Sequence, residues 1–189
     1  MKSIISEIFQ ESARVRETFI TESLETLIEV INQLIEVIKR GDKILLFGNG
    51  GSAADAQHIA AEFVNRYRIE RRPLPALALT TDTSILTAIG NDYNFNDIFS
   101  KQIQALGRKG DAAIGISTSG NSTNVNNGLK IAREIGLVTV GLGGAPNSPM
   151  KNCCDHYLSV HGSITPRIQE THTIIGHTII EILDLKLFG

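Results

Sequence analysis

The 189-residue chain has few cysteines, no excess of basic residues and no long apolar run. Its only cysteines are the adjacent Cys153 and Cys154, a spacing that rarely forms a useful disulfide and that fits a reducing compartment. A net charge of −2 argues against a broad nucleic-acid surface. No apolar stretch approaches the roughly 20 residues that span a bilayer, and the charged N-terminal stretch lacks a signal-peptide core. We therefore expect a cytoplasmic protein that binds neither nucleic acid nor membrane.

The apolar residues change their spacing after residue 40. Before it, they follow helical periodicity and predict two helices, the second of which ends at Gly41. Beyond it, short apolar runs alternate with helical stretches, which predicts a parallel sheet covered by helices on both faces. The runs interpreted as strands are Lys43–Phe47, Leu74–Leu79, Ala112–Ser117, Val138–Leu142 and Tyr157–Val160. The helical stretches are Ser52–Tyr67, Ser84–Ile89, Phe95–Leu106, Thr123–Ile135 and Pro166–Leu187.

These patterns predict one α/β domain over residues 1–189, with N-terminal helices over 1–40 and an α/β core over 41–189 that ends in a C-terminal helix. No internal repeat or linker divides the chain.

Two loops rich in glycine and serine follow predicted strands, at Gly48–Ser52 and Ser117–Ser122. In open α/β sheets, ligands bind beyond the carboxyl ends of the strands, where helix N-termini offer free N–H groups to a phosphate. The same residues also build ordinary turns, so each loop alone supports both interpretations equally. Neither loop is a P-loop or a dinucleotide fingerprint, which disfavours ATP and NAD and leaves a smaller phosphorylated ligand.

Histidine and carboxylate side chains share a face of the helix after the first loop, where His58 and Glu62 are four residues apart and Asp55 lies close by. Such a pair can hold a metal ion, act as an acid–base pair, or be an ordinary surface pair. The last helix carries Gln169 with two further histidines, His172 and His177. Spacing alone does not choose between these two histidines.

Together these motifs resemble the phosphoheptose isomerase (D-sedoheptulose 7-phosphate isomerase) family of the sugar-isomerase (SIS) fold. The resemblance rests on GNGGSAADAQHIAAE at 48–62, STSGNS at 117–122, and RIQE at 167–170 followed by His177. It implies a three-layer fold with a five-stranded parallel sheet, and a cytoplasmic homotetramer with active sites at subunit interfaces. It also implies a sugar-phosphate substrate, isomerised between aldose and ketose on the route to nucleotide-activated heptose for surface polysaccharide.

The resemblance also implies a set of site residues. One zinc ion per subunit would be bound by His58, Glu62, Gln169 and His177. The residues that would contact the substrate are Asn49, Gly50, Gly51, Glu62, Asn91, Asp92, Ser117, Thr118, Ser119, Ser122 and Gln169.

The reaction would move a proton between two sugar carbons through an enediol(ate), with Glu62 as the base and His177 as the acid–base partner. Gln169 and His177 lie about 12 Å apart along an ideal helix, so either that helix is irregular or the two ligands of one ion come from different subunits, and we favour the second.

Other SIS proteins are the alternatives. The DnaA initiator-associating protein resembles much of the chain and needs no catalysis. Its pattern lacks the acid at the Glu62 position and the histidine at the His177 position, and this chain has both. An isomerase for another sugar phosphate is the second alternative, because the loops are suited to phosphate rather than to sugar length.

Overall fold

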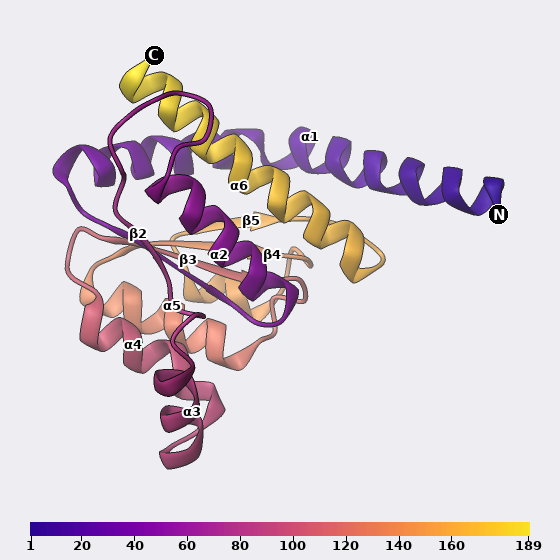
Figure 1. The fold of residues 1–189 in the computed structure, drawn as a ribbon. Coiled ribbons are helices and arrows are strands. Elements are labelled where there is room, and N and C mark those ends of the chain that lie inside the picture. Colours follow the sequence, from indigo (N-terminus) through magenta and orange to yellow (C-terminus); the bar gives the residue numbers. More distant parts are fainter.

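A five-stranded parallel sheet with the order β2-β1-β3-β4-β5 lies at the centre of the computed structural model, which describes residues 1–189 (Figure 1). The strands are β1 (Ile44–Gly48), β2 (Ala76–Ala78), β3 (Ala112–Ser117), β4 (Val138–Gly143) and β5 (His156–Ser159). The helices are α1 (Lys2–Arg40), α2 (Gly51–Val64), α3 (Thr83–Asp92), α4 (Ile98–Leu106), α5 (Thr123–Ile135) and α6 (Thr165–Phe188), with short 3₁₀ turns η1 (Phe95–Asp97) and η2 (Pro149–Cys153). The predicted α/β fold with a five-stranded parallel sheet is confirmed.

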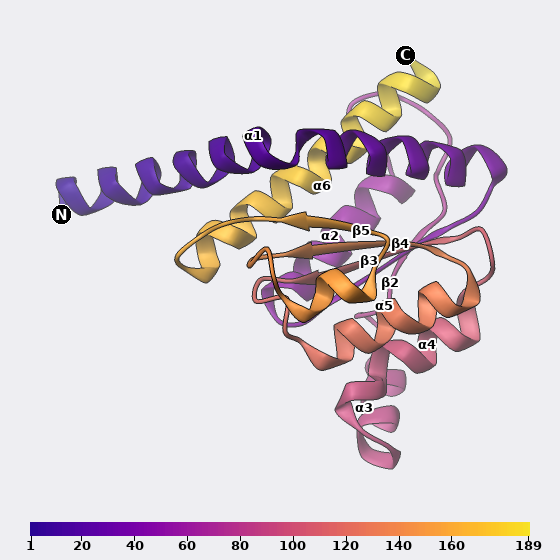
Figure 2. The ribbon, with the colours of Figure 1, turned by 180° about the vertical axis from the view of Figure 1, so that it is seen from behind.

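Helices cover both faces of the sheet because its strands are apolar on both sides. In β1, Ile44 and Leu46 face a core that α1, α2 and α6 complete, whereas Leu45 and Phe47 face a second core beneath α4 and α5. The view from behind shows α1 and α6 crossing above the sheet and α4 and α5 below it (Figure 2). This layering places α2 and α6 on the same face.

The N-terminal segment is one helix and not two. Residues 1–40 contain neither glycine nor proline, so nothing in the backbone interrupts the helix before Gly41. Gly41 ends it in the left-handed conformation, with φ of 82°. The N-terminal half of α1 extends beyond the body of the protein (Figures 1 and 2), which leaves apolar side chains such as Ile4 and Phe9 exposed. The prediction of two helices was therefore wrong.

Two further elements lie on the α4 side of the sheet. The predicted helix 95–106 begins as the 3₁₀ turn η1 before α4 continues it. Helix α3 buries none of its residues and packs mainly against η1 and α4, at the bottom of the view in Figure 1. None of the helices combines the length and the apolar composition that a membrane span requires.

Candidate active site

The two glycine–serine loops lie side by side because β1 and β3 are neighbours in the sheet, with Gly48 paired in register with Ile116. Ser117 is buried at the end of β3, and its hydroxyl shares a hydrogen bond of 2.9 Å with the hydroxyl of Ser122. Helices α2 and α5, which follow the loops, both begin without a side-chain N-cap hydrogen bond. Their first turns can therefore offer N–H groups and the positive end of the helix dipole to an anion.

Asn49 connects the two loops. Its Nδ2 donates to Oδ1 of Asn124 at 2.8 Å, and Nδ2 of Asn124 donates back to Oδ1 of Asn49 at 2.9 Å. This reciprocal pair holds the first loop against the first turn of α5. Sequence reasoning missed Asn124, whose only signal was an amide in the turn after the second loop. The pair uses one donor and one acceptor position of the Asn49 amide, and the predicted contact of Asn49 with substrate stays a prediction.

The candidate chemistry lies where α2 and α6 run parallel to each other, a contact that we call the α2–α6 seam (Figure 1). His58 on α2 and His177 on α6 meet with their Nε2 atoms 2.8 Å apart, a hydrogen bond in which one ring carries the proton. Glu62, one turn further along α2, has Oε1 3.8 Å from Nε2 of His58. Two imidazoles and a carboxylate of one chain therefore converge.

Tyr67 completes this cluster. Its ring stacks on that of His177, with centroids 5.4 Å apart and an interplanar angle of 23°. The ring of His58 approaches the same imidazole edge-on, at 5.1 Å between centroids. His177 is thus held between two rings. Sequence reasoning missed Tyr67, because it follows the end of α2 and reaches His177 only through the tertiary fold.

Gln169 lies elsewhere on the seam. It is two turns before His177 on α6, and its amide lies so close to Gly51 that a Cβ at position 51 would collide with it. The histidine pair and Gln169 are therefore separate points along one seam. Helix α6 is continuous through both residues, so the irregular helix that could have brought Gln169 and His177 together is not seen. That the second ligand comes from another subunit stays a prediction.

A model of the SIS domain family matches residues 7–144. The phosphoheptose isomerases of Nitratidesulfovibrio vulgaris and Aneurinibacillus thermoaerophilus are each 52% identical to this chain, over 99% of it and 90% of the former, and over 100% of it and 96% of the latter. The solved structure of phosphoheptose isomerase from Neisseria gonorrhoeae has a TM-score of 0.91 and 41% identity, and the match covers 97% of this chain and 98% of that one. The chain belongs to the phosphoheptose isomerase family of SIS-domain proteins.

Within this family assignment, two predicted substrate contacts lie away from the seam. Asn91 and Asp92 are exposed at the end of α3, where Nδ2 of Asn91 donates to Oδ1 of Asp92 at 2.8 Å. Helix α3 projects on the α4 side of the sheet, whereas α2 and α6 cover the other face (Figure 1). A single chain does not bring these two residues to His58 and His177.

The remaining histidines have other surroundings. His172 is fully buried, and its Nε2 donates to the carbonyl of Gly143 at 3.3 Å. Burial lowers the pKa of His172 from 6.5 to about 4, and the hydrogen bond to Gly143 opposes this shift. His156 and His161 approach Glu29 and Glu22 of α1 at 3.7 and 3.0 Å. All three therefore have structural partners away from the seam.

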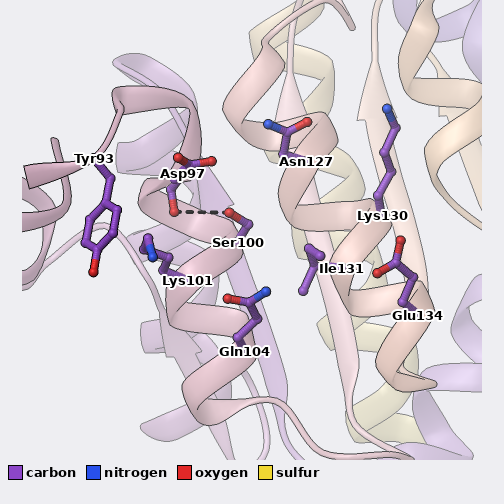
Figure 3. A pocket seen from close by; sticks show the side chains of 9 residues that line it. All are labelled: Tyr93, Asp97, Ser100, Lys101, Gln104, Asn127, Lys130, Ile131 and Glu134. Carbon is purple, nitrogen blue, oxygen red and sulfur yellow. Dashed lines mark hydrogen bonds between the residues drawn. The ribbon is translucent and has the colours of Figure 1, made fainter.

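A hollow of about 380 Å³ lies on the other face of the sheet, between α4 and α5 (Figure 3). Its lining is mostly polar and includes Asp97, Lys101 and Lys130. The ammonium group of Lys101 stands 3.5 Å from the ring centre of Tyr93. None of the residues predicted to form the site lines this hollow, so it is separate from the candidate active site.

The zinc ligands implied by the family can be compared with the side chains present. Two imidazoles and a carboxylate are donors that zinc commonly takes, so His58, His177 and Glu62 fit the metal by chemistry. Their spacing is that of a hydrogen-bonded pair, since two ligands of one tetrahedral zinc stand roughly 3.4 Å apart for bonds of about 2.1 Å. The structure contains no cluster of three or more His, Cys, Asp or Glu side chains placed closely enough to hold a metal ion.

Proposed function

We propose that this protein is a phosphoheptose isomerase that converts D-sedoheptulose 7-phosphate to D-glycero-D-manno-heptose 7-phosphate. The observation that carries the proposal is the convergence of His58, Glu62 and His177, in a chain 52% identical to phosphoheptose isomerases over nearly its whole length. The product would supply nucleotide-activated heptose biosynthesis. The cytoplasmic location implied by the family resemblance is part of this proposal.

Proton transfer between C1 and C2 of the open-chain sugar needs a base at carbon and an acid at oxygen. Glu62 takes the role of base, because its carboxylate lies 3.8 Å from the imidazole of His58, which is itself hydrogen-bonded to His177. His177 takes the role of acid–base partner. Its stack on Tyr67 holds one ring orientation, so the proton is delivered to a fixed position.

The phosphate binds at the paired loops, through the hydroxyls of Ser117, Thr118, Ser119 and Ser122 and the backbone at Gly50 and Gly51. Glycine is needed at position 50 because its φ is 54°. The neighbouring N-termini of α2 and α5 add positive potential without a lysine or arginine. Because these contacts are remote from C1 and C2, their binding energy can orient the reacting carbons.

One zinc ion per subunit is part of the proposal, with His58, Glu62 and His177 as protein ligands and Gln169 as the fourth implied donor. The ion would supply Lewis-acid polarisation of the sugar carbonyl and its neighbouring oxygens. The support is the donor chemistry of the seam and the family membership of the chain.

A homotetramer is the proposed assembly, and two observations support self-association. Apolar side chains line a groove of about 380 Å³ between α1 and α6: Ile20, Leu24, Leu27, Ile28, Ile31, Ile35 and Ile182. The N-terminal turns of α1 add the exposed Ile4 and Phe9, so a second copy would cover an apolar face. The α3 of a neighbouring copy would then bring Asn91 and Asp92 to the site that one chain leaves without them.

The test is a coupled assay of the purified protein with D-sedoheptulose 7-phosphate. Glu62→Gln should lower kcat by roughly 100-fold or more, because it removes the base and keeps the shape. Glu70→Gln is the matched control, since Glu70 is a carboxylate 85% exposed beyond the end of α2. We expect this control to stay within about twofold of the wild type. Near wild-type turnover of Glu62→Gln would remove Glu62 from the mechanism.

Chelation tests the metal separately. Activity lost with a chelator and restored by zinc would support the proposed ion, and full activity after complete metal removal would contradict it. A folded wild-type protein with no turnover under either condition would refute the isomerase assignment.

A further inference from the structure

The α2–α6 seam brings successive turns of the two helices together. Gly51 faces Gln169, Asp55 faces Thr173, and one turn later the histidine pair meets. Glycine allows this close contact from each side, because a Cβ on Gly51 or on Gly176 would collide with the facing helix. A side chain inside the seam is therefore held with little freedom.

Asp55 is the carboxylate buried within this seam, and only 9% of the residue is exposed. Its Oδ1 accepts a hydrogen bond from Oγ1 of Thr173 at 3.1 Å, while its Oδ2 is buried without a hydrogen-bond partner. Burial raises the pKa of Asp55, and the side chains of Thr173 and Gln169 together with the charge of His58 act in the opposite direction. The amide of Gln169 lies against Gly51, one turn before Asp55 on α2, and it is among the groups that act on Asp55.

We propose that Asp55 is a positioning residue that turns the Nε2 of Gln169 toward its own carboxylate and thereby presents the Oε1 of Gln169 to the sugar. This inference rests on the proposed function and on the predicted contact of Gln169 with the substrate. The same Oε1 is the donor that Gln169 would offer to the proposed ion. The reason is that an ionised carboxylate only accepts hydrogen bonds, whereas an amide has one donor end and one acceptor end. The acceptor end facing Asp55 would bring two oxygens together, so a single orientation remains. A sugar hydroxyl would then donate a hydrogen bond to the Oε1 of Gln169.

Asp55→Asn is the direct test. The new side chain keeps the shape and can still accept from Thr173, but its amide nitrogen donates where Oδ2 stood. The donor favours the opposite orientation of Gln169, which turns Nε2 toward the sugar. We expect kcat/KM for D-sedoheptulose 7-phosphate to fall about tenfold or more, with a melting temperature no lower than that of the wild type.

A double variant in which the carboxylate and the amide exchange positions separates a positioning role of Asp55 from a packing role. In Asp55→Asn with Gln169→Glu, the carboxylate at position 169 accepts from the amide at position 55 with one oxygen and offers the other to the sugar. We expect this double variant to be at least threefold more active than Asp55→Asn, and also more active than Gln169→Glu alone, in which two carboxylates face each other. A role in packing alone predicts no such recovery.

Asp155→Asn is the matched control, because Asp155 also accepts from a threonine hydroxyl, that of Thr139 at 2.7 Å, but lies near β5 and away from the seam. Its kcat/KM should stay within twofold of the wild type. Asp55→Asn with wild-type kcat/KM, or a double variant no better than both single variants, would overturn the inference. A wild-type protein without turnover would instead overturn the proposed function. If Asp55→Asn does not fold, the double variant compared with Gln169→Glu still decides the question.

Discussion

Replacing Arg71 with methionine should destabilise the fold by about 3–5 kcal/mol, because it leaves the buried carboxylate of Asp184 without its charge partner. The two side chains are 0% and 1% exposed, and Nε of Arg71 donates to Oδ1 of Asp184 at 2.7 Å. The other guanidinium hydrogens are donated to carbonyls at the end of α2, among them those of Glu62 and Phe63 at 2.9 and 2.8 Å. Methionine would remove these donors from the end of the helix that carries Glu62.

The size of the effect can be measured by thermal and urea unfolding at a fixed protein concentration. For a domain of this length, about 2–4 °C per kcal/mol corresponds to a melting temperature lower by roughly 6–20 °C. Arg133→Met is the control, since Arg133 pairs with Asp155 at 3.1 Å with 54% of its side chain exposed. It should change stability by no more than about 1 kcal/mol.

A double variant tests the cause. Arg71→Met with Asp184→Leu removes both charges, and apolar replacement of a buried ion pair is often nearly neutral. The double variant should therefore recover most of the stability lost in Arg71→Met. A double variant as unstable as Arg71→Met would refute the argument that the stranded charge of Asp184 is the main cost.

Two further predictions follow from single contacts. Tyr67→Leu removes the ring stacked on His177 and should lower kcat/KM roughly 2- to 10-fold, since aromatic pairs contribute about 0.5–1.5 kcal/mol. An unchanged kcat/KM would show that the stack does not orient the imidazole. His172, whose pKa burial lowers to about 4, should make the protein less stable as the pH falls from 6.5 toward 4, because the unfolded chain takes up the proton first. The loss in the free energy of unfolding approaches roughly 3 kcal/mol near pH 4. Urea unfolding at pH 7 and pH 4.5 should show a smaller loss for His172→Gln than for the wild type. Equal losses in the two proteins would contradict this cause.

The core strands and helices could be predicted from the sequence because their apolar periodicity is strong. The bounds of β3 and α5 agree with the prediction at both ends, since Ser117 closes an entirely buried strand and Gly136 ends an amphipathic helix in the left-handed conformation. The break predicted within residues 1–40 does not exist, because no glycine or proline interrupts the backbone there. Periodicity reports which face is buried and not where a helix is continuous.

The site was less predictable because it depends on how two helices face each other. The sequence places His58 and Glu62 on one face of α2 by their four-residue spacing, and the structure brings both to the seam. It does not distinguish His172 from His177. Five residues separate them, which is about 140° around a helix, so only one of them can face α2. The structure directs His177 to His58 and buries His172 against Gly143.

The α2–α6 seam separates anion binding from the proposed proton transfer, which a single loop could not do. Anion binding depends on loop backbone and hydroxyl groups at the ends of β1 and β3, whereas the proposed proton transfer depends on side chains that only the contact of α2 with α6 brings together. Because α2 begins in the first loop and carries His58 two turns later, one rigid helix fixes the distance between the two functions. The other wall of the seam is set by Gly176, which allows α6 to approach Ile59, and by the buried pair of Arg71 and Asp184. Catalysis should therefore be more sensitive to changes that shift α6 along α2 than to changes elsewhere on either helix.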